Sequence, residues 1–237
     1  MLETRLGNTS QTLHRMVFWW EVKQKIEKVN ILKNIILLVF ENQFELASTF
    51  LRFQEHYESP EFRGKVFTLD EYKEWYIKQK GSFSYYTDWN GFNIPSHIIS
   101  PFKEGRFDPL SEKELGLINV LKEETGNFYI IGVHKELELP RRQQNLKHEV
   151  AHGLFYTNPQ YKTEVQNILS KYDLTDLKKW LKSINGYHDE VLEDECHAFS
   201  LTGSTKLPIQ IPLELNKSLE SIFADFTKSV NLNQQLS

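Results

Sequence analysis

The feature that most constrains this 237-residue chain is a pair of histidines, His148 and His152, with Glu149 between them. In an α-helix, residues four apart lie one turn above each other on the same face, so both imidazoles can reach one point in space. The residues around the pair are largely apolar, and we expect the helix predicted over 142–156 to be buried. The chain therefore needs a fold that buries one helix and places a second element opposite its histidines.

Two neutral imidazoles on one helical face are suitable ligands for zinc, which binds nitrogen in tetrahedral geometry. Zinc lowers the pKa of its bound water toward neutrality, and a neighbouring carboxylate can accept the proton as that water attacks. The motif predicts one Zn²⁺ per chain, held by His148 and His152, with Glu149 as catalytic base. The alternative is an ordinary helix whose histidines face solvent or find partners in the core.

A catalytic zinc site needs a third protein ligand and an open fourth position. In the predicted helix 189–201, Glu195 falls on the apolar face, whereas Glu193 falls with His197 and Ser200 on a face that we expect to be solvated. Burying a carboxylate is costly unless something pairs it, and a metal ion would do so. We therefore predict Glu195 as the third ligand. The alternatives, in order, are Glu193, His188 and His197.

Amide hydrolysis also needs a hydrogen-bond donor for the developing oxyanion. Tyr156, Tyr187 and His188 are candidates, although residues of these types more often pack or support a ligand than act in catalysis. Asp194 can orient a ligand imidazole by accepting its second N–H, as metal-bound histidines generally require, or it can be an exposed acidic residue.

Composition excludes several other classes. The chain is 40% hydrophobic and 25% charged, which is typical of soluble globular proteins. A net charge of −4 gives no electrostatic reason to expect nucleic acid or a membrane as partner, and one cysteine excludes an intramolecular disulfide. The most apolar run, 31–40, is too short to span a bilayer and is interpreted as a core segment. With no readable secretory signal, we expect a cytoplasmic protein.

Periodicity and turn residues predict a mixed N-terminal half. Helices are predicted over 13–40 and 44–57, a weak strand over 63–67, and an aromatic, turn-rich stretch without regular structure over 82–108. Capping boxes at Thr68 to Glu71 and Ser111 to Glu114 open two further helices, which end near Gly81 and Glu124. The strongest strand signal covers 128–133.

After Pro140 the chain is predicted to be mainly helical. The expected helices cover 142–156, 159–171, 174–185, 189–201 and 213–229.

The predicted site resembles that of gluzincin-type metallopeptidases. His148 to His152 followed by Gly153, together with Glu195-Cys196-His197-Ala198, is similar to their two ligand segments, in which a second helix supplies glutamate in a Glu-x-x-Ala setting. Segments 153–159, 186–188 and 191–198 also resemble blocks in uncharacterised bacterial proteins. The resemblance covers roughly residues 128–201 and implies a zinc site and peptide-bond hydrolysis.

The spacing departs from several known zincin patterns. The metzincin extension needs glycine at Phe155 and histidine at Asn158, and the thermolysin-like glutamate would fall at Lys171 or Tyr172. Glu195 instead follows His152 by about forty residues.

The sequence thus predicts an α+β, zincin-like fold with a small sheet in its N-terminal half. One domain over 1–237 is expected, with possible subdomains at 1–125 and 126–237, the second carrying the metal. Strand 128–133 lies upstream of the site helix, where a substrate-pairing edge strand belongs. The predicted activity is that of a metallopeptidase acting on a peptide or protein. The alternative is a non-catalytic module that holds zinc structurally and binds a protein or peptide partner, although such a module has no need of Glu149.

Overall fold

The computed structural model describes residues 26–185, 187–203 and 207–232, and within them the fold is α+β. Its sheet has four strands in the order β1-β2-β4-β3. Their bounds are β1 (Glu27–Leu32), β2 (Ile35–Phe40), β3 (Gly91–Pro95) and β4 (Tyr129–His134). β2 pairs antiparallel with β1 and parallel with β4, and β3 closes the order by pairing antiparallel with β4.

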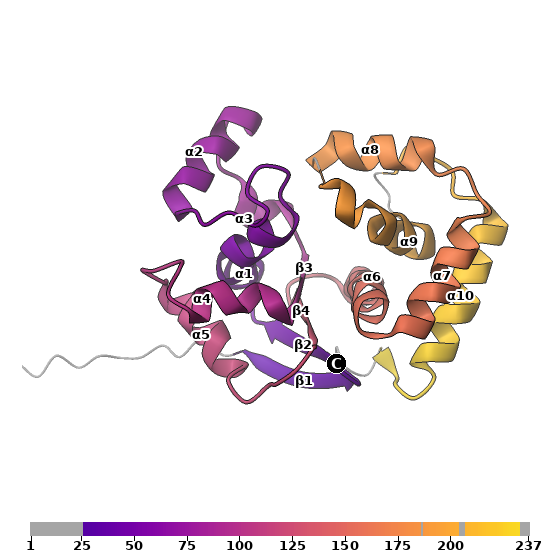
Figure 1. Cartoon of the computed structure of the whole chain (residues 1–237), viewed down its shortest axis with the longest axis horizontal. Coiled ribbons are helices and arrows are strands. Elements are labelled where there is room, and N and C mark those ends of the chain that lie inside the picture. The colour runs from indigo at the N-terminus through magenta and orange to yellow at the C-terminus, as the bar shows by residue number, and fades with distance from the viewer. Residues whose placement is uncertain (1–25, 186, 204–206, 233–237) are drawn as a thin grey trace, which may run out of the picture.

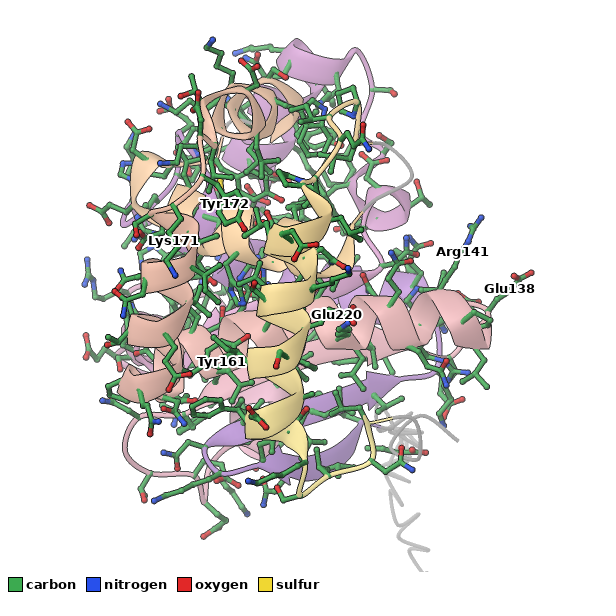
Figure 2. The ribbon with its side chains drawn as sticks, turned by 90° about the vertical axis from the view of Figure 1, so that its right-hand side faces the viewer. Glu138, Arg141, Tyr161, Lys171, Tyr172 and Glu220 are labelled. Carbon is green, nitrogen blue, oxygen red and sulfur yellow. The ribbon has the colours of Figure 1, made fainter. Side chains whose placement is uncertain are left out.

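The sheet lies between two groups of helices (Figure 1). The first group is α1 (Gln43–Glu58), α2 (Leu69–Lys80), α3 (Tyr85–Asp88), α4 (Ser100–Lys103) and α5 (Glu112–Val120), with a 3-10 turn, η1 (Ser96–Ile99). The second group is α6 (Leu139–Thr157), α7 (Pro159–Leu169), α8 (Thr175–Asn185), α9 (Leu192–Thr202) and α10 (Leu213–Thr227), with the turn η2 (Asp189–Val191). Figure 2 shows α6 running crosswise to α7 and α10.

Strand β2 explains the two layers, because all six of its residues are buried. Alternate side chains face opposite sides of a sheet. One set packs with the first helical group: Ile36, Leu38 and Phe40. The other set packs with the second group: Ile35, Leu37 and Val39. A strand covered on both faces has no polar alternation, so it reads as one continuous apolar run.

The helix predicted over 13–40 is wrong for residues 27–40, because the continuous apolar run of β2 was interpreted as helical. They form the hairpin of β1 and β2 instead, with Asn34 in the left-handed region at φ 63°, where asparagine is tolerated. A short apolar run does not distinguish a buried strand from a buried helix. Residues 13–25 lie outside the described residues. The interpretation of 31–40 as a core segment is confirmed.

The strand predicted over 128–133 is confirmed as β4, but its expected place at the edge of the sheet is wrong. β4 lies between β2 and β3, so the edge beside α6 is formed by β3. β3 lies inside the stretch 82–108, for which we predicted no regular structure. Its signals are the Asn90-Gly91 turn pair and the apolar residues that follow. The aromatic residues of this stretch are core residues, with Tyr85 and Phe92 buried.

Predictions that rested on local signals are confirmed. Both capping boxes are formed, at Thr68 with Glu71 and at Ser111 with Glu114. The helix that begins after Ser111 ends earlier than predicted, at Val120, and 63–67 forms no strand. The helices predicted after Pro140 are present, except that 189–201 is divided into η2 and α9.

Helix α6 lies unusually close to the sheet at Gly153. A Cβ atom there would lie 2.9 Å from Cδ1 of Ile35, which is too close for an ordinary contact. The glycine therefore lets the backbone of α6 approach β2, and this approach positions the histidines of α6 relative to the edge strand. Within the described residues no helix has the length and apolarity needed to cross a bilayer.

Candidate metal centre

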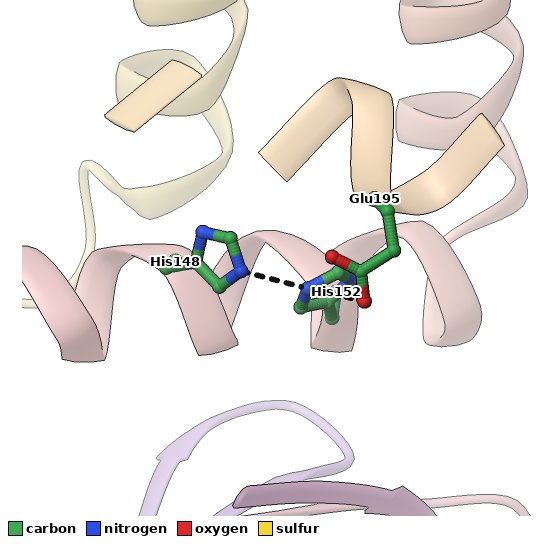
Figure 3. A group of neighbouring side chains, drawn as sticks. All are labelled: His148, His152 and Glu195. Carbon is green, nitrogen blue, oxygen red and sulfur yellow. Dashed lines mark hydrogen bonds and ion pairs between the residues drawn. The ribbon is translucent and has the colours of Figure 1, made fainter. Parts of the chain in front are cut away.

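His148 and His152 project from one face of α6 toward Glu195, which comes down from α9 (Figure 3). One ligand atom from each of the three lies within 4.8 Å of the others. The two Nε2 atoms are 3.2 Å apart, and Nε2 of His152 is 3.7 Å from Oε1 of Glu195. The three residues predicted as ligands are therefore brought together, and they form a group that could hold a metal ion.

The other ring nitrogen of each histidine is held by a neighbouring oxygen. Nδ1 of His152 lies 2.9 Å from Oδ2 of Asp194. Nδ1 of His148 lies 3.1 Å from the hydroxyl of Thr202, which itself donates to the carbonyl of Ala198 at 2.8 Å. Because that hydroxyl has already used its proton, it accepts from His148. Both imidazoles are then protonated at Nδ1 and present an Nε2 lone pair to the centre.

This donor set fits a metal ion. The two Nε2 atoms are 3.2 Å apart, which is close to the separation of roughly 3.3 Å expected between two nitrogens on one tetrahedral zinc. Oε2 of Glu195 is buried and has no hydrogen-bond partner in the part of the chain that the structure describes. A cation at the centre would give the buried carboxylate its missing partner.

The electrostatics of the protein alone also favour a cation. Burial, together with the neighbouring carboxylates of Asp194 and Glu149, raises the pKa of Glu195 to about 8 against the opposing effect of His152. Burial opposes protonation of His152, but Asp194 and Glu195 outweigh it and hold the pKa of His152 well above its usual value. Without a metal the cluster therefore holds protons tightly, and a bound cation would take their place.

Glu149, the predicted base, is buried on the side of α6 that faces β3. Its Oε2 accepts a hydrogen bond of 2.6 Å from Nδ2 of Asn93, whose Oδ1 accepts from the hydroxyl of Tyr129. A Cβ atom on Gly91 would lie 2.5 Å from Oε1 of Glu149, so glycine is needed at the start of β3 to make room for this carboxylate. Burial raises the pKa of Glu149, which makes it a better proton acceptor.

Three polar residues near Glu149 were missed by the sequence analysis. The backbone N–H of Asn93 donates to Oε1 of Gln54 on α1 at 3.2 Å, and Nε2 of Gln54 donates to Glu58 at 2.6 Å. Burial, followed by the charge of Glu195, raises the pKa of Glu58 well above its usual value. Besides α6 and α9, helix α1 thus brings another carboxylate close to the metal centre. Only the tertiary contacts of Glu58 reveal this role, since the sequence of α1 is typical of an ordinary core helix.

The alternative third ligands lie elsewhere. Glu193 is exposed and accepts a hydrogen bond from Gln166, while Nδ1 of His188 accepts from the backbone N–H of Glu190 in η2. His197 is fully buried beside the hydroxyl of Tyr161, at 2.9 Å.

The face of α9 that carries Glu193, His197 and Ser200, which we expected to be solvated, is therefore only partly exposed. Glu193 is exposed, but His197 and Ser200 are buried, because α7 and α10 also pack against α9. The ring of His197 stacks on Phe155, and its Nδ1 lies 3.5 Å from Oδ1 of Asp194. His197 therefore helps to hold the carboxylate that orients His152.

The candidate oxyanion donors are spread over the protein. The hydroxyl of Tyr156, at the end of α6, lies 3.1 Å from Nδ1 of His97, and its ring packs against Tyr129. Tyr187 packs with the cluster around α8, and His188 begins η2. Tyr156 thus contacts Tyr129, whose hydroxyl is part of the network that holds Glu149.

Comparisons of this chain with known proteins found no relative. No family model matches the chain, and no curated protein or solved structure shows significant similarity to it. The functional interpretation therefore rests on the residues themselves.

Proposed function

We propose that this chain is a zinc-dependent hydrolase of the zincin type, acting as a metallopeptidase on a peptide or protein. One observation carries the proposal: His148, His152 and Glu195 converge on one point, with Glu149 on the same helix. A metal site that serves only structure does not need Glu149. The hydrogen bond from Asn93 to this carboxylate supports a role that depends on its orientation.

In this proposal the two histidines and Glu195 hold the zinc ion and leave one coordination position open. When bound, zinc supplies Lewis acidity, which polarises a carbonyl group and makes water more acidic. Glu149 accepts the proton of the attacking water and then delivers it to the leaving amine. Asn93 fixes the orientation of Glu149, and Asp194 fixes that of His152.

One observation favours the second candidate, a module that keeps zinc for structure and binds a partner. The backbone N–H of Asn93, on the edge strand, is bonded to the side chain of Gln54. An extended peptide can pair with that position of β3 only after Gln54 moves aside. The two candidates are separated by whether the metal-loaded protein cleaves peptides.

The decisive variant is Glu149→Gln, which removes the base but keeps the size and the hydrogen bond capacity of the side chain. Metal analysis should give about one zinc per chain for both proteins. Cleavage of a mixed peptide library, followed by mass spectrometry, should be seen only for the wild type. A zinc-loaded wild type that cleaves no peptide would establish the second candidate.

The ligand assignment is tested by two neighbouring glutamates on α9. Glu195→Ala should lose zinc, because Glu195 is buried in the centre, whereas Glu193→Ala should keep it, because Glu193 is exposed. The reverse result would refute the assignment of Glu195 as third ligand.

A further inference from the structure

Three buried nitrogen atoms lie along the side of α6 and β4 that leads away from Glu149. They are Nε of Arg142, Nδ2 of Asn145 and Nδ1 of His134, and none has a hydrogen-bond partner among the described residues. Nε of Arg142 and Nδ2 of Asn145 are donors, whereas Nδ1 of His134 is an acceptor, because Nε2 of the same ring donates to Oδ1 of Asn90. Buried donors without acceptors are rare in native proteins and call for an explanation. Arg142, Asn145 and Glu149 are spaced by three and four residues, so they follow one face of α6.

Asn145 lies directly beside the proposed base. A Cβ atom on Gly91 would lie 2.5 Å from Nδ2 of Asn145 and equally 2.5 Å from Oε1 of Glu149. Both atoms therefore pack against the backbone at the start of β3. A group bound by Asn145 would lie next to the carboxylate that we propose to move the proton.

Arg142 lies one turn before Asn145 on α6, on the side of the helix toward the end of β4. Its positive charge adds to burial in lowering the pKa of His134, which places the guanidinium near that ring. Nε2 of His134 is occupied by the side chain of Asn90, at 3.1 Å. Oε2 of Glu136 is 3.9 Å from Nδ1 of His134 and accepts a hydrogen bond from the backbone N–H of Gln43.

Arg52, a buried residue, shows what a purely structural role requires. Arg52 donates to both oxygens of Glu114 and to the carbonyls of Phe107 and Pro109. Each of its three nitrogens therefore has an acceptor. Arg142 is half-buried, and for its buried Nε the described residues supply no acceptor.

We propose that Arg142 and Asn145 form a subsite that binds a carboxylate of the substrate beside Glu149. The inference rests on the proposed function, which it sharpens by naming an acidic group in the substrate. Arginine and amide N–H groups match the two oxygens of a carboxylate, and Arg142 lies in the first turn of α6, where the helix dipole also favours negative charge. The carboxylate is either the free carboxyl terminus of a peptide or an acidic side chain.

The test measures binding, so it does not depend on turnover. Zinc-loaded Glu149→Gln protein is titrated calorimetrically with three peptides: N-acetyl-trialanine as the free acid, the same peptide as its amide, and an amidated peptide with one aspartate. The free acid or the aspartate peptide should bind about 10- to 100-fold more tightly than the neutral amide. Which of the two is preferred identifies the source of the carboxylate.

Arg142→Ala in the same background should remove this preference and leave the weak binding of the neutral amide unchanged. The matched control is Arg141→Ala, since Arg141 is exposed and points away from the protein at the outer end of α6 (Figure 2). Asn145→Asp provides a second variant, which should weaken carboxylate binding by repulsion. Thermal unfolding of each variant verifies that it is folded.

Equal binding of all three peptides, or no measurable binding of either acidic peptide, overturns the proposal. So does a preference that survives Arg142→Ala. Failure of the proposed function is seen in other measurements, as a wild type that lacks zinc or cleaves no peptide. The titrations measure binding alone, so they still report whether the subsite selects a carboxylate.

Discussion

The two faces of the sheet both bury charged groups, but they do so in different ways. On the face of α1 and α5, the guanidinium of Arg52 and the carboxylate of Glu114 form two hydrogen bonds of 2.6 Å, so the charges cancel. On the face of α6 and α9, Asp194 and Glu195 lie 2.9 Å and 3.7 Å from ring nitrogens of His152. The first arrangement satisfies both charged groups, whereas in the second Oε2 of Glu195 has no hydrogen-bond partner among the described residues.

The comparison teaches how to separate structural from functional burial of charge. Removing one partner of a complete pair should mainly lower stability, because it leaves an uncompensated charge in the interior. Changing the incomplete site should mainly alter metal binding, since its charges are not balanced by the protein alone. The predictions below test this contrast.

The largest effect is expected for Arg52→Ala. This variant strands the buried carboxylate of Glu114 and should lower the free energy of unfolding by about 3–5 kcal/mol. Urea denaturation monitored by circular dichroism measures the change. The exposed Arg106→Ala is the matched control and should change stability by less than about 0.5 kcal/mol. A loss for Arg52→Ala as small as that of the control would contradict the prediction.

Glu55 is an exception on the face of α1 and α5, because no basic residue is among the groups that shift its pKa. Burial raises its pKa from 4.5 to about 7, even though hydroxyls of Tyr85, Tyr72 and Ser59 favour the charged form. The folded state therefore holds this proton more tightly than the unfolded state does. The resulting stability is complete below pH 4.5 and is lost as pH rises to about 7.

Glu55→Gln should remove this pH dependence, which amounts to up to roughly 3 kcal/mol between pH 4 and pH 8. Urea denaturation at several pH values compares the variant with wild type. The exposed Glu123→Gln should leave the wild-type pH profile unchanged. A Glu55→Gln profile parallel to that of wild type would show that burial does not shift this group.

The smallest effect is expected for Asp194→Asn, which changes the group that orients His152 but none of the proposed ligands. Loss of the charge should weaken zinc binding about 10- to 100-fold. Competition with a chromogenic chelator gives the affinity. Glu193→Gln, the exposed neighbour, serves as control and should bind zinc as tightly as wild type. Unchanged affinity in Asp194→Asn would mean that its contact with His152 only supports the fold.

How far the sequence predicts this protein depends on the range of the interactions involved. Helix α6 and the capping boxes at Thr68 and Ser111 depend on neighbours within one turn, so they were predictable. The buried position of Glu195 was also predictable from the helical phase of α9. These features together bring the three proposed ligands onto two facing helices.

Features that depend on distant contacts were not predictable. β2 is covered on both faces, which removed the alternation that marks a strand, and β3 is short and ends at Pro95. Glu58 and Gln54 reach the metal centre only because α1 packs against β3, which lies more than thirty residues further along the chain. Nothing within α1 itself distinguishes these residues from other polar positions of a helix.

The parallel pairing of β2 with β4 also sets an order of events during synthesis. These two central strands are separated by nearly a hundred residues, so the sheet cannot be completed until the ribosome has passed His134. All three proposed ligands come later in the chain, on α6, which packs against β2 and β4, and on α9, which packs against α6. A chain that carries the ion would then be one in which both helices are already in place.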